Sequence, residues 1–273
     1  MTRLGLALHW ALFVVTALVL NFPILATALT SLKTTADINA SPPVWLFAPT
    51  LEHYRTVLTD PSLDFPRYLV NSTVIASLGT LFAVLLTLPA AYAIVRLRTG
   101  GRLLLPAVVS LRAVPLVVFA IPLYLLYQAL GLLDTRLGLS FIACLIGLPT
   151  ALLMFAGWLR EVPPELEEAA RVDGAGTLAV LRHVVLPLAR PALIAVVVLT
   201  FIGAWNEFLF GLILTTRNAV PVTVGATFFI TSWGVKWGAT AAAMTLSALP
   251  PLLLGFVAYR FLGRALLAGA LKG

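Results

Sequence analysis

Four of the chain's eleven acidic residues fall within one fourteen-residue stretch, PPELEEAARVDGAG, which spans Pro163–Gly176. These four are Glu165, Glu167, Glu168 and Asp173. Carboxylates serve in proton transfer, in metal binding or in pairing with a cationic partner, and the surrounding residue types decide among these roles. The rest of the chain is strongly apolar, so charged chemistry is concentrated here.

Catalysis and metal binding are both disfavoured by the residues available. No serine, histidine and carboxylate gather at one depth of the apolar segments, so no nucleophile–base arrangement is indicated. The three histidines, His9, His53 and His183, are widely separated, and the single cysteine, Cys144, lies inside an apolar run. The sequence therefore predicts neither an intramembrane enzyme nor a metal site, which leaves pairing with a partner.

The acidic stretch has the pattern of a helix about ten residues long. Pro164 suits the first helical position, early glutamates complement the positive end of the helix dipole, and Gly174 after Asp173 is a typical helix end. Because a helix this short is marginal in isolation, it needs a surface to pack against. One predicted face holds Leu166, Ala169 and Ala170; another holds Glu165, Glu168 and Arg171; and Glu167 is placed to pair with Arg171.

A second short helix is predicted over roughly Thr177–Val185, after the Gly-Ala-Gly turn. Leu186 and Pro187 end it just before the chain re-enters the membrane at Pro191. The two helices would form a knob in the segment 160–190. The alternative is a solvated linker that merely joins two spans.

Three further polar residues lie inside apolar segments, where charge is costly and normally faces a cavity or a partner. Arg112 is either a lining residue that holds substrate hydroxyls or gates a path, or a structural partner of carbonyls freed near Pro115. Glu207, beside Asn206, is either an outer gate or substrate contact, or an interfacial residue paired with Arg217. Both pairs of alternatives stay open at this point.

Composition places these residues in a membrane. The chain is 60% hydrophobic and only 11% charged, with a mean hydropathy of +1.02; a soluble domain is about 25% charged. The net charge of +7 and pI of about 10.1 come from short basic clusters between apolar runs. Such clusters mark the cytoplasmic ends of membrane helices, so no nucleic-acid partner is predicted.

Six segments are long and apolar enough to cross the bilayer, which needs about 20 residues as helix. They are Leu4–Leu29, Leu69–Val95, Leu103–Leu126, Leu137–Leu159, Ala192–Leu214 and Ala239–Leu262. The first also resembles a secretory signal peptide, but its apolar run exceeds the usual length of about 7–15 residues. We therefore expect one all-α, six-span membrane domain over residues 1–273.

The basic residues predict the orientation of the spans. Eleven Lys and Arg residues fall in one set of connections and six in the alternate set, which includes the outer segment Ser31–Pro66. The positive-inside rule then places both termini and the 160–190 segment in the cytoplasm. No duplication of one half in the other is visible, which disfavours an ion-coupled secondary carrier built from inverted repeats.

Glu168-Ala169-Ala170, then Gly174, Val184 and Leu186-Pro187, have the spacing E-A-A-x3-G-x9-I-x-L-P, with Val184 in place of Ile. This resembles the signature loop of bacterial ABC-importer permeases. Over nearly the whole chain the sequence is similar to the smaller permease of maltose-type carbohydrate importers. Further matching motifs are SLK at 31–33, NS at 71–72, AAYAIVRLR at 90–98, IPLYLL at 121–126, GLLDT at 131–135, WNEF at 205–208 and GALKG at 269–273.

The resemblance implies a type I ABC-importer permease fold in the bacterial inner membrane, surrounded by lipid. It implies four partner proteins: a homologous permease, two cytoplasmic ATPase subunits and an extracytoplasmic solute-binding protein. ATP and Mg²⁺ would bind the ATPase subunits, in keeping with the absence of G-x-x-x-x-G-K-[S/T] here. The cargo would be a sugar, oligosaccharide or polyol, with a non-sugar solute such as glycerol phosphate as the alternative. The residues implied in ATPase coupling are Glu165, Glu168, Ala169, Ala170, Arg171, Asp173 and Gly174.

Overall fold

A computed structural model describes residues 3–61, 64–100, 103–231 and 234–270. The chain divides into two compact units, Met1–Arg67 with Gly225–Leu249, and Tyr68–Val224 with Pro250–Gly273. The prediction of a single domain stays a prediction. Arg102, Lys272 and the last three residues of the GALKG motif lie outside the described residues.

The first unit contains the N-terminal helix α1 (Arg3–Ser31) and the segment that follows it. This segment, expected as a surface loop, carries two short helices, α2 (Thr35–Ile38) and α3 (Glu52–Thr59). The chain re-enters the unit through η4 (Ala226–Phe229). A two-stranded antiparallel ladder then pairs β1 (Ile230–Thr231) with β2 (Gly234–Val235), and the first part of α14 (Trp237–Ala270) follows.

Four of the six predicted spans are continuous helices. They are α1, α4 (Phe65–Val95), α7 (Arg136–Glu161) and α14. Prolines lie inside all four without ending them, which membrane helices tolerate when neighbouring groups satisfy the freed carbonyls. Among the described residues, these are the helices long and apolar enough to cross a membrane unaided, and the number is up to six if each of two bent helix pairs counts as one span.

The third predicted span is broken rather than straight. The first part is α5 (Leu104–Ser110) with η1 (Leu111–Ala113), and the second is η2 (Leu116–Phe119) with α6 (Ala120–Ala129). The two parts meet at an angle of 98°. Pro115 causes the break, because it has no N–H and forces Val114 into an extended conformation (φ −84°, ψ 125°).

The fifth predicted span is also interrupted. α11 (Arg190–Trp205) ends before Asn206, and the separate helix α12 (Leu209–Leu214) follows. The helical segment Thr177–Leu188 meets α11 at an angle of 77°. In the second unit, sharp turns therefore separate the helical parts of the third and fifth predicted spans.

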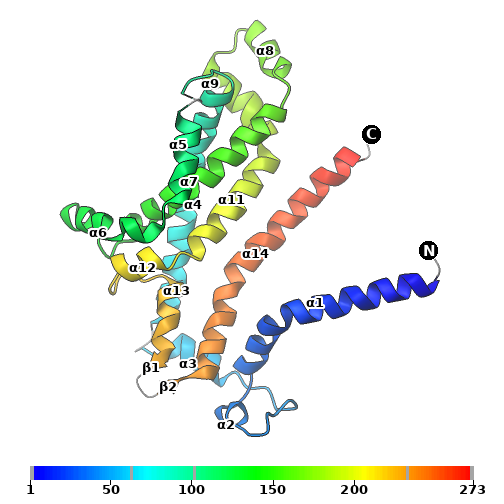
Figure 1. Ribbon diagram of the computed structural model, residues 1–273, viewed down its shortest axis with the longest axis vertical. Coiled ribbons are helices and arrows are strands. Elements are labelled where there is room, and N and C mark those ends of the chain that lie inside the picture. Colours follow the sequence, from blue (N-terminus) through cyan, green and yellow to red (C-terminus); the bar gives the residue numbers. More distant parts are fainter. Residues whose placement is uncertain (1–2, 62–63, 101–102, 232–233, 271–273) are drawn as a thin grey trace. The chain divides into compact units, whose positions relative to one another are not determined.

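The core of the second unit lies between α4, α7 and α11. Its fully buried side chains include Phe155 of α7 and Val196 of α11, packed with Ala91 of α4. Figure 1 shows α8 (Glu165–Val172) and α9 (Thr177–Val180) at one end of this bundle, and α6 and α12 at the opposite end. The candidate sites lie at these two ends and in a cavity beside α7.

Candidate functional site

The predicted acidic helix is α8, a helix of eight residues that begins after Pro164. Its end matches the expectation for Gly174, which has a left-handed φ of +88°. The N–H of Gly174 donates to the carbonyl of Arg171 (3.0 Å), and the N–H of Ala175 donates to that of Ala170 (3.0 Å). This pair of bonds is a Schellman motif, in which the glycine position favours a residue without a side chain.

The sequence did not predict which side of α8 packs against the rest of the chain. Leu166 is 48% exposed and Ala169 is exposed, whereas the side chain that turns inward is Glu167, at 2% exposure. Ala170 does pack inward, against an apolar cluster that contains Leu159 of α7. Burial of a glutamate needs compensating partners, and α4 provides them.

Both carboxylate oxygens of Glu167 are hydrogen-bonded, one to a residue of the last turn of α4 and the other to the residue that follows α4. Arg96 Nε donates to Glu167 Oε1 at 2.7 Å, and Tyr92 Oη donates to Oε2 at 2.9 Å. Arg96 also donates to the carbonyl of Val162 at 2.6 Å. The predicted Glu167–Arg171 pair is absent from the ion pairs of the described residues; instead Arg171 donates to Tyr92 Oη at 3.0 Å.

The second helix of the knob continues further than expected. α9 leads into a π-helical turn, η3 (Leu181–Val185), and then α10 (Leu186–Leu188). Val180 and Val185 are buried together with Tyr92 and Leu159 in one apolar cluster. Close packing onto α4 and α7 distinguishes this knob from a solvated linker.

The remaining predicted coupling residues are on the surface of the knob. Glu165, Glu168, Arg171, Asp173 and Gly174 are exposed. Apolar side chains are exposed among them: Leu166 at 48%, Val172 at 87% and Leu178 at 77%. Such a combination of apolar and acidic side chains on a rigid protrusion suits contact with another protein.

Arg112 lies beside an open cavity of about 400 Å³. Its Nη1 donates to the hydroxyl of Thr150 on α7 at 3.1 Å. Apolar residues of the broken third span, α7 and α12 form most of the wall; among the described lining residues, Arg112 alone is charged. The hydrogen-bond partner of Arg112 within the described part of the chain is thus a side-chain hydroxyl beside the cavity.

Glu207 lies between α11 and α12 and caps the start of α12. Its carboxylate accepts the N–H groups of Phe210 (2.9 Å) and Gly211 (3.1 Å), which begin α12 and lack helical partners. No ion pair joins Glu207 to Arg217 within the described parts of the chain. Asn206 is exposed at the end of α11. Arg112, Asn206 and Glu207 are therefore not gathered into one site around the cavity.

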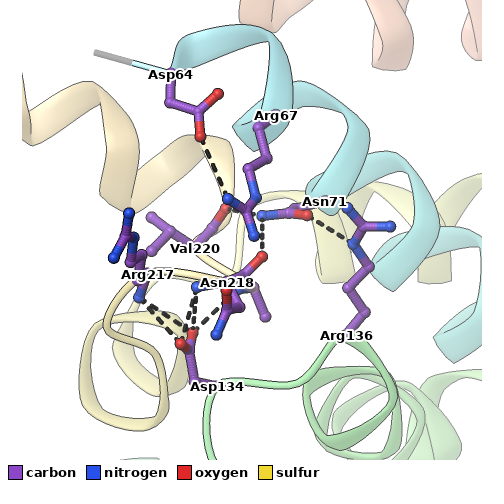
Figure 2. Close-up of polar contacts among 9 residues, drawn as sticks. Asp64, Arg67, Asn71, Asp134, Arg136, Arg217, Asn218 and Val220 are labelled. Atoms are coloured by element: carbon purple, nitrogen blue, oxygen red, sulfur yellow. Dashed lines mark hydrogen bonds and ion pairs between the residues drawn. The ribbon is translucent and has the colours of Figure 1, made fainter. Parts of the chain in front are cut away.

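A polar arrangement that the sequence analysis missed involves Asp134. Its carboxylate accepts backbone N–H groups from four consecutive residues, 216–219, at 2.8–3.2 Å. Figure 2 shows the bonds from Arg217 and Asn218. Burial raises the pKa of Asp134, but these backbone bonds outweigh burial and leave the pKa below its ordinary value. The GLLDT motif contained this residue, but only a structure reveals that its partners are 82–85 residues away.

Asn71 fastens the same loop to α4. Its amide nitrogen donates to the carbonyls of Asn218 (3.1 Å) and Val220 (2.9 Å), and its oxygen accepts from Arg136 Nε (2.7 Å). Figure 2 shows Asn71 between the loop and Arg136. Ser72 adds a bond by accepting the N–H of Val222 at 2.7 Å. We call the contacts of Asp134, Asn71 and Ser72 with residues 216–222 the loop clamp.

Among the residues that the structure describes, no three His, Cys, Asp or Glu side chains are grouped so as to hold a metal ion. The geometry thus presents a protruding knob, a mostly apolar cavity and a clamped loop.

Comparison with known proteins assigns this architecture. Residues 79–267 match the family model described as "Binding-protein-dependent transport system inner membrane component". The chain is 38% identical to the trehalose/maltose transport system permease protein MalG of Thermococcus litoralis, over 85% of this chain and 84% of that protein. It is 32% identical to the sulfoquinovosyl glycerol transport system permease protein SmoH of Agrobacterium fabrum, over 92% and 89% of the two chains.

A solved structure agrees with the sequence matches. A chain from the crystal structure of a bacterial ABC transporter that imports the acidic polysaccharide alginate superposes with a TM-score of 0.76. The alignment covers 95% of this chain and 96% of the other, at 25% sequence identity. This likeness and the family match confirm the predicted permease fold, and the chain belongs to the family of binding-protein-dependent transport system inner membrane components.

Proposed function

We propose that this chain is one permease subunit of a binding-protein-dependent ABC importer for a carbohydrate. Relatives across most of its length are permeases for trehalose/maltose and for sulfoquinovosyl glycerol, and a similar structure belongs to an alginate importer. The cargoes named for these three proteins are all saccharides or glycosides. A carbohydrate is therefore the cargo class that these relatives support.

The observation that carries this proposal is the rigid knob with an exposed acidic and apolar surface. Glu165, Glu168 and Asp173 are exposed on the same short segment as the exposed apolar residues Leu166 and Val172. A groove on a cytoplasmic ATPase subunit, apolar at its floor and basic at its rim, would complement this surface. ATP and Mg²⁺ would bind the ATPase subunits, and their closure would move the knob.

The complete assembly would contain a second, homologous permease, two ATPase subunits and an extracytoplasmic binding protein. In this arrangement both termini and the knob face the cytoplasm, and Ser31–Pro66 faces outward. The excess of basic residues on the side of the knob, eleven against six, supports that orientation.

The orientation is tested by thiol labelling of intact cells with an impermeant reagent. Ala36→Cys and Thr177→Cys, each in a Cys144→Ala background, place single thiols at exposed positions on opposite predicted sides. Only position 36 should react in intact cells, and both should react after permeabilisation. Labelling of position 177 alone in intact cells would reverse the orientation.

For the substrate pathway we assign Arg112 as a contact for cargo hydroxyls. It borders the cavity, and its guanidinium already donates to one hydroxyl, that of Thr150. Arg112→Lys should retain part of the uptake and Arg112→Ala little, with both variants assembled normally. Failure of Arg112→Ala to hold its partner subunits would instead assign Arg112 a structural role. Asn206 and Glu207 border the turn into α12 and are proposed to shape the pathway indirectly.

Gly174 provides the decisive test of coupling. Gly174→Leu and Gly174→Asp should abolish ATP-driven uptake while the chain still inserts in the membrane, because the damage lies in the knob. A Cβ at Gly174 meets no described atom of this chain within 4 Å, so the backbone φ, and not a clash at the Cβ, is the internal cost of a first side-chain atom here. Glu168→Ala should reduce uptake less, since partly solvated ion pairs contribute little each.

Uptake is measured with the reconstituted importer and normalised to the amount of permease and co-purified ATPase. Gly176→Leu is the matched control, since Gly176 is exposed, also has open space around it and has an ordinary φ of −72°. Normal uptake by Gly174→Leu at normal abundance would reject the knob as the coupling element. The cargo class is tested separately, by calorimetric titration of the cognate binding protein with trehalose, maltose and glycerol phosphate.

A further inference from the structure

We infer that Glu167 is a positioning residue, whose contacts with Arg96 and Tyr92 fasten the knob to α4 so that the two move together. We call these contacts the Glu167 latch. The inference rests on the proposed coupling role of α8 and adds the route by which its movement reaches the membrane helices. The surface of α8 would meet the ATPase, and its inner side would drive α4.

The three glutamates of α8 differ in their surroundings. Glu165 and Glu168 are exposed, whereas the side chain of Glu167 is 3% exposed and that of its partner Arg96 is 13% exposed. The chain thus uses one glutamate internally and leaves the other two available to a partner. A buried carboxylate with donors on both oxygens is held in a single orientation.

Arg96 joins three pieces of chain. It follows directly on α4, and its own N–H donates to the carbonyl of Tyr92 (2.9 Å), so it extends the helical hydrogen-bond pattern. Its guanidinium contacts both Glu167 on α8 and the carbonyl of Val162 at the end of α7. One side chain therefore fixes the entry to the knob and the first turn of its helix.

Tyr92 adds a second connection one turn earlier on α4. Its hydroxyl donates to Glu167 and accepts from Arg171, so it joins residues near the two ends of α8. Its ring is buried with Val180 and Val185 from the second part of the knob. Because both parts of the knob contact Tyr92, α8 cannot shift alone without breaking these contacts.

The opposite end of α4 carries Asn71 and Ser72 of the loop clamp. Asn71 and Arg96 are 25 positions apart, which corresponds to about 37 Å along a helix. α4 is continuous between them, with Pro89 inside it. The helix therefore links the knob at one end to the 216–222 loop at the other. We expect displacement of the knob to move α4 and, through α4, the 216–222 loop.

The test compares transport with ATP hydrolysis in proteoliposomes that contain the complete importer. Glu167→Gln keeps the size of the side chain but removes the charge. We expect the amount of cargo imported per ATP hydrolysed to fall about fivefold, a typical size for the loss of one coupling contact. Co-purification of the ATPase should be unchanged, because the exposed surface of α8 is intact.

Two further variants separate positioning from a merely structural role. Tyr92→Phe retains the buried ring and should lower the ratio of cargo to ATP about twofold. The charge exchange Glu167→Arg with Arg96→Glu should recover more than half of the ratio lost in Glu167→Gln. Arg98→Gln is the matched control, because Arg98 is exposed two positions beyond Arg96, and it should transport normally.

An unchanged ratio in Glu167→Gln would overturn the inference, as would an equal loss in Arg98→Gln. If Glu167→Gln does not accumulate, Tyr92→Phe decides the question, and a normal ratio in that variant rejects the latch. The outcome is distinguishable from failure of the proposed function. Loss of uptake in Gly174→Leu with normal coupling in the latch variants would reject the latch alone.

Discussion

The two ends of α4 are fastened to their surroundings by different chemistry. At the knob, Glu167 and Arg96 bring opposite charges together in a mostly buried contact. At the loop clamp, charged groups meet neutral ones: Asp134 meets backbone N–H groups, and Arg136 meets the amide of Asn71. If one partner is removed at the knob, the other is left as a buried charge without a counter-charge. If one partner is removed at the loop clamp, the groups left without a hydrogen bond are neutral backbone groups or a charge that water still partly reaches.

The largest expected effect comes from breaking the charge pair from one side. Arg96→Met should lower the free energy of unfolding by about 4 kcal/mol, because the Glu167 carboxylate stays buried without its cation. The double variant Arg96→Met with Glu167→Met should be more stable than Arg96→Met alone. SDS-induced unfolding in mixed micelles provides the measurement. A double variant less stable than either single one would show that the charges are not the main cost.

The next largest loss of stability is expected at the loop clamp, where the neutral amide of Asn71 makes the contacts. Asn71 is fully buried. In Asn71→Leu, the carbonyls of Asn218 and Val220 and the guanidinium of Arg136 lose their hydrogen bonds to the Asn71 amide. We expect a loss of about 3 kcal/mol, below that of Arg96→Met. Thr73→Ala is a suitable control, since the exposed hydroxyl of Thr73 bonds only within its own helix. Equal losses of unfolding free energy in Asn71→Leu and Thr73→Ala would show that the Asn71 amide does not stabilise the loop clamp.

Sequence reasoning recovered the features that depend on local composition. Apolar length predicted α4 and α7 nearly to their ends, and the Asp-Gly sequence predicted the helix end at Gly174. It also placed α8 within two residues of its true start and end. These features depend on properties that neighbouring residues determine among themselves.

Partners far apart in the sequence were not predicted. Glu167 and Arg171 have the spacing of a helical pair, and nothing local reveals that Tyr92 and Arg96, over 70 positions earlier, offer better partners. The break at Pro115 was likewise ambiguous, since Pro89 and Pro149 bend no helix to the same degree. Whether a proline interrupts a span depends on tertiary contacts, and these contacts cannot be predicted from a single sequence.

A smaller effect is expected at Asp134, where several weak donors share one carboxylate. Asp134→Ala should cost about 2 kcal/mol, because the loop N–H groups lose their acceptor but partly regain water. The pKa of Asp134 is depressed in the folded chain, so its contribution is complete above the unfolded value near 3.8 and is lost as pH falls through the folded pKa. SDS unfolding as a function of pH should therefore show a decline below about pH 4 that Asp134→Asn lacks. The same decline in Asp134→Asn would assign it to other carboxyl groups.

The smallest effect distinguishes backbone strain from partner contact at the end of α8. Gly174→Ala in the permease alone should cost about 1 kcal/mol, because alanine resists a φ of +88° although its Cβ meets no atom within 4 Å. Gly176→Ala, at φ −72° and with equally open space, should cost almost nothing. If Gly174→Leu costs no more than Gly174→Ala in SDS unfolding yet loses far more uptake, the excess arises where the knob meets its partner. Equal loss of uptake in the two variants would place the whole effect in the backbone of the knob.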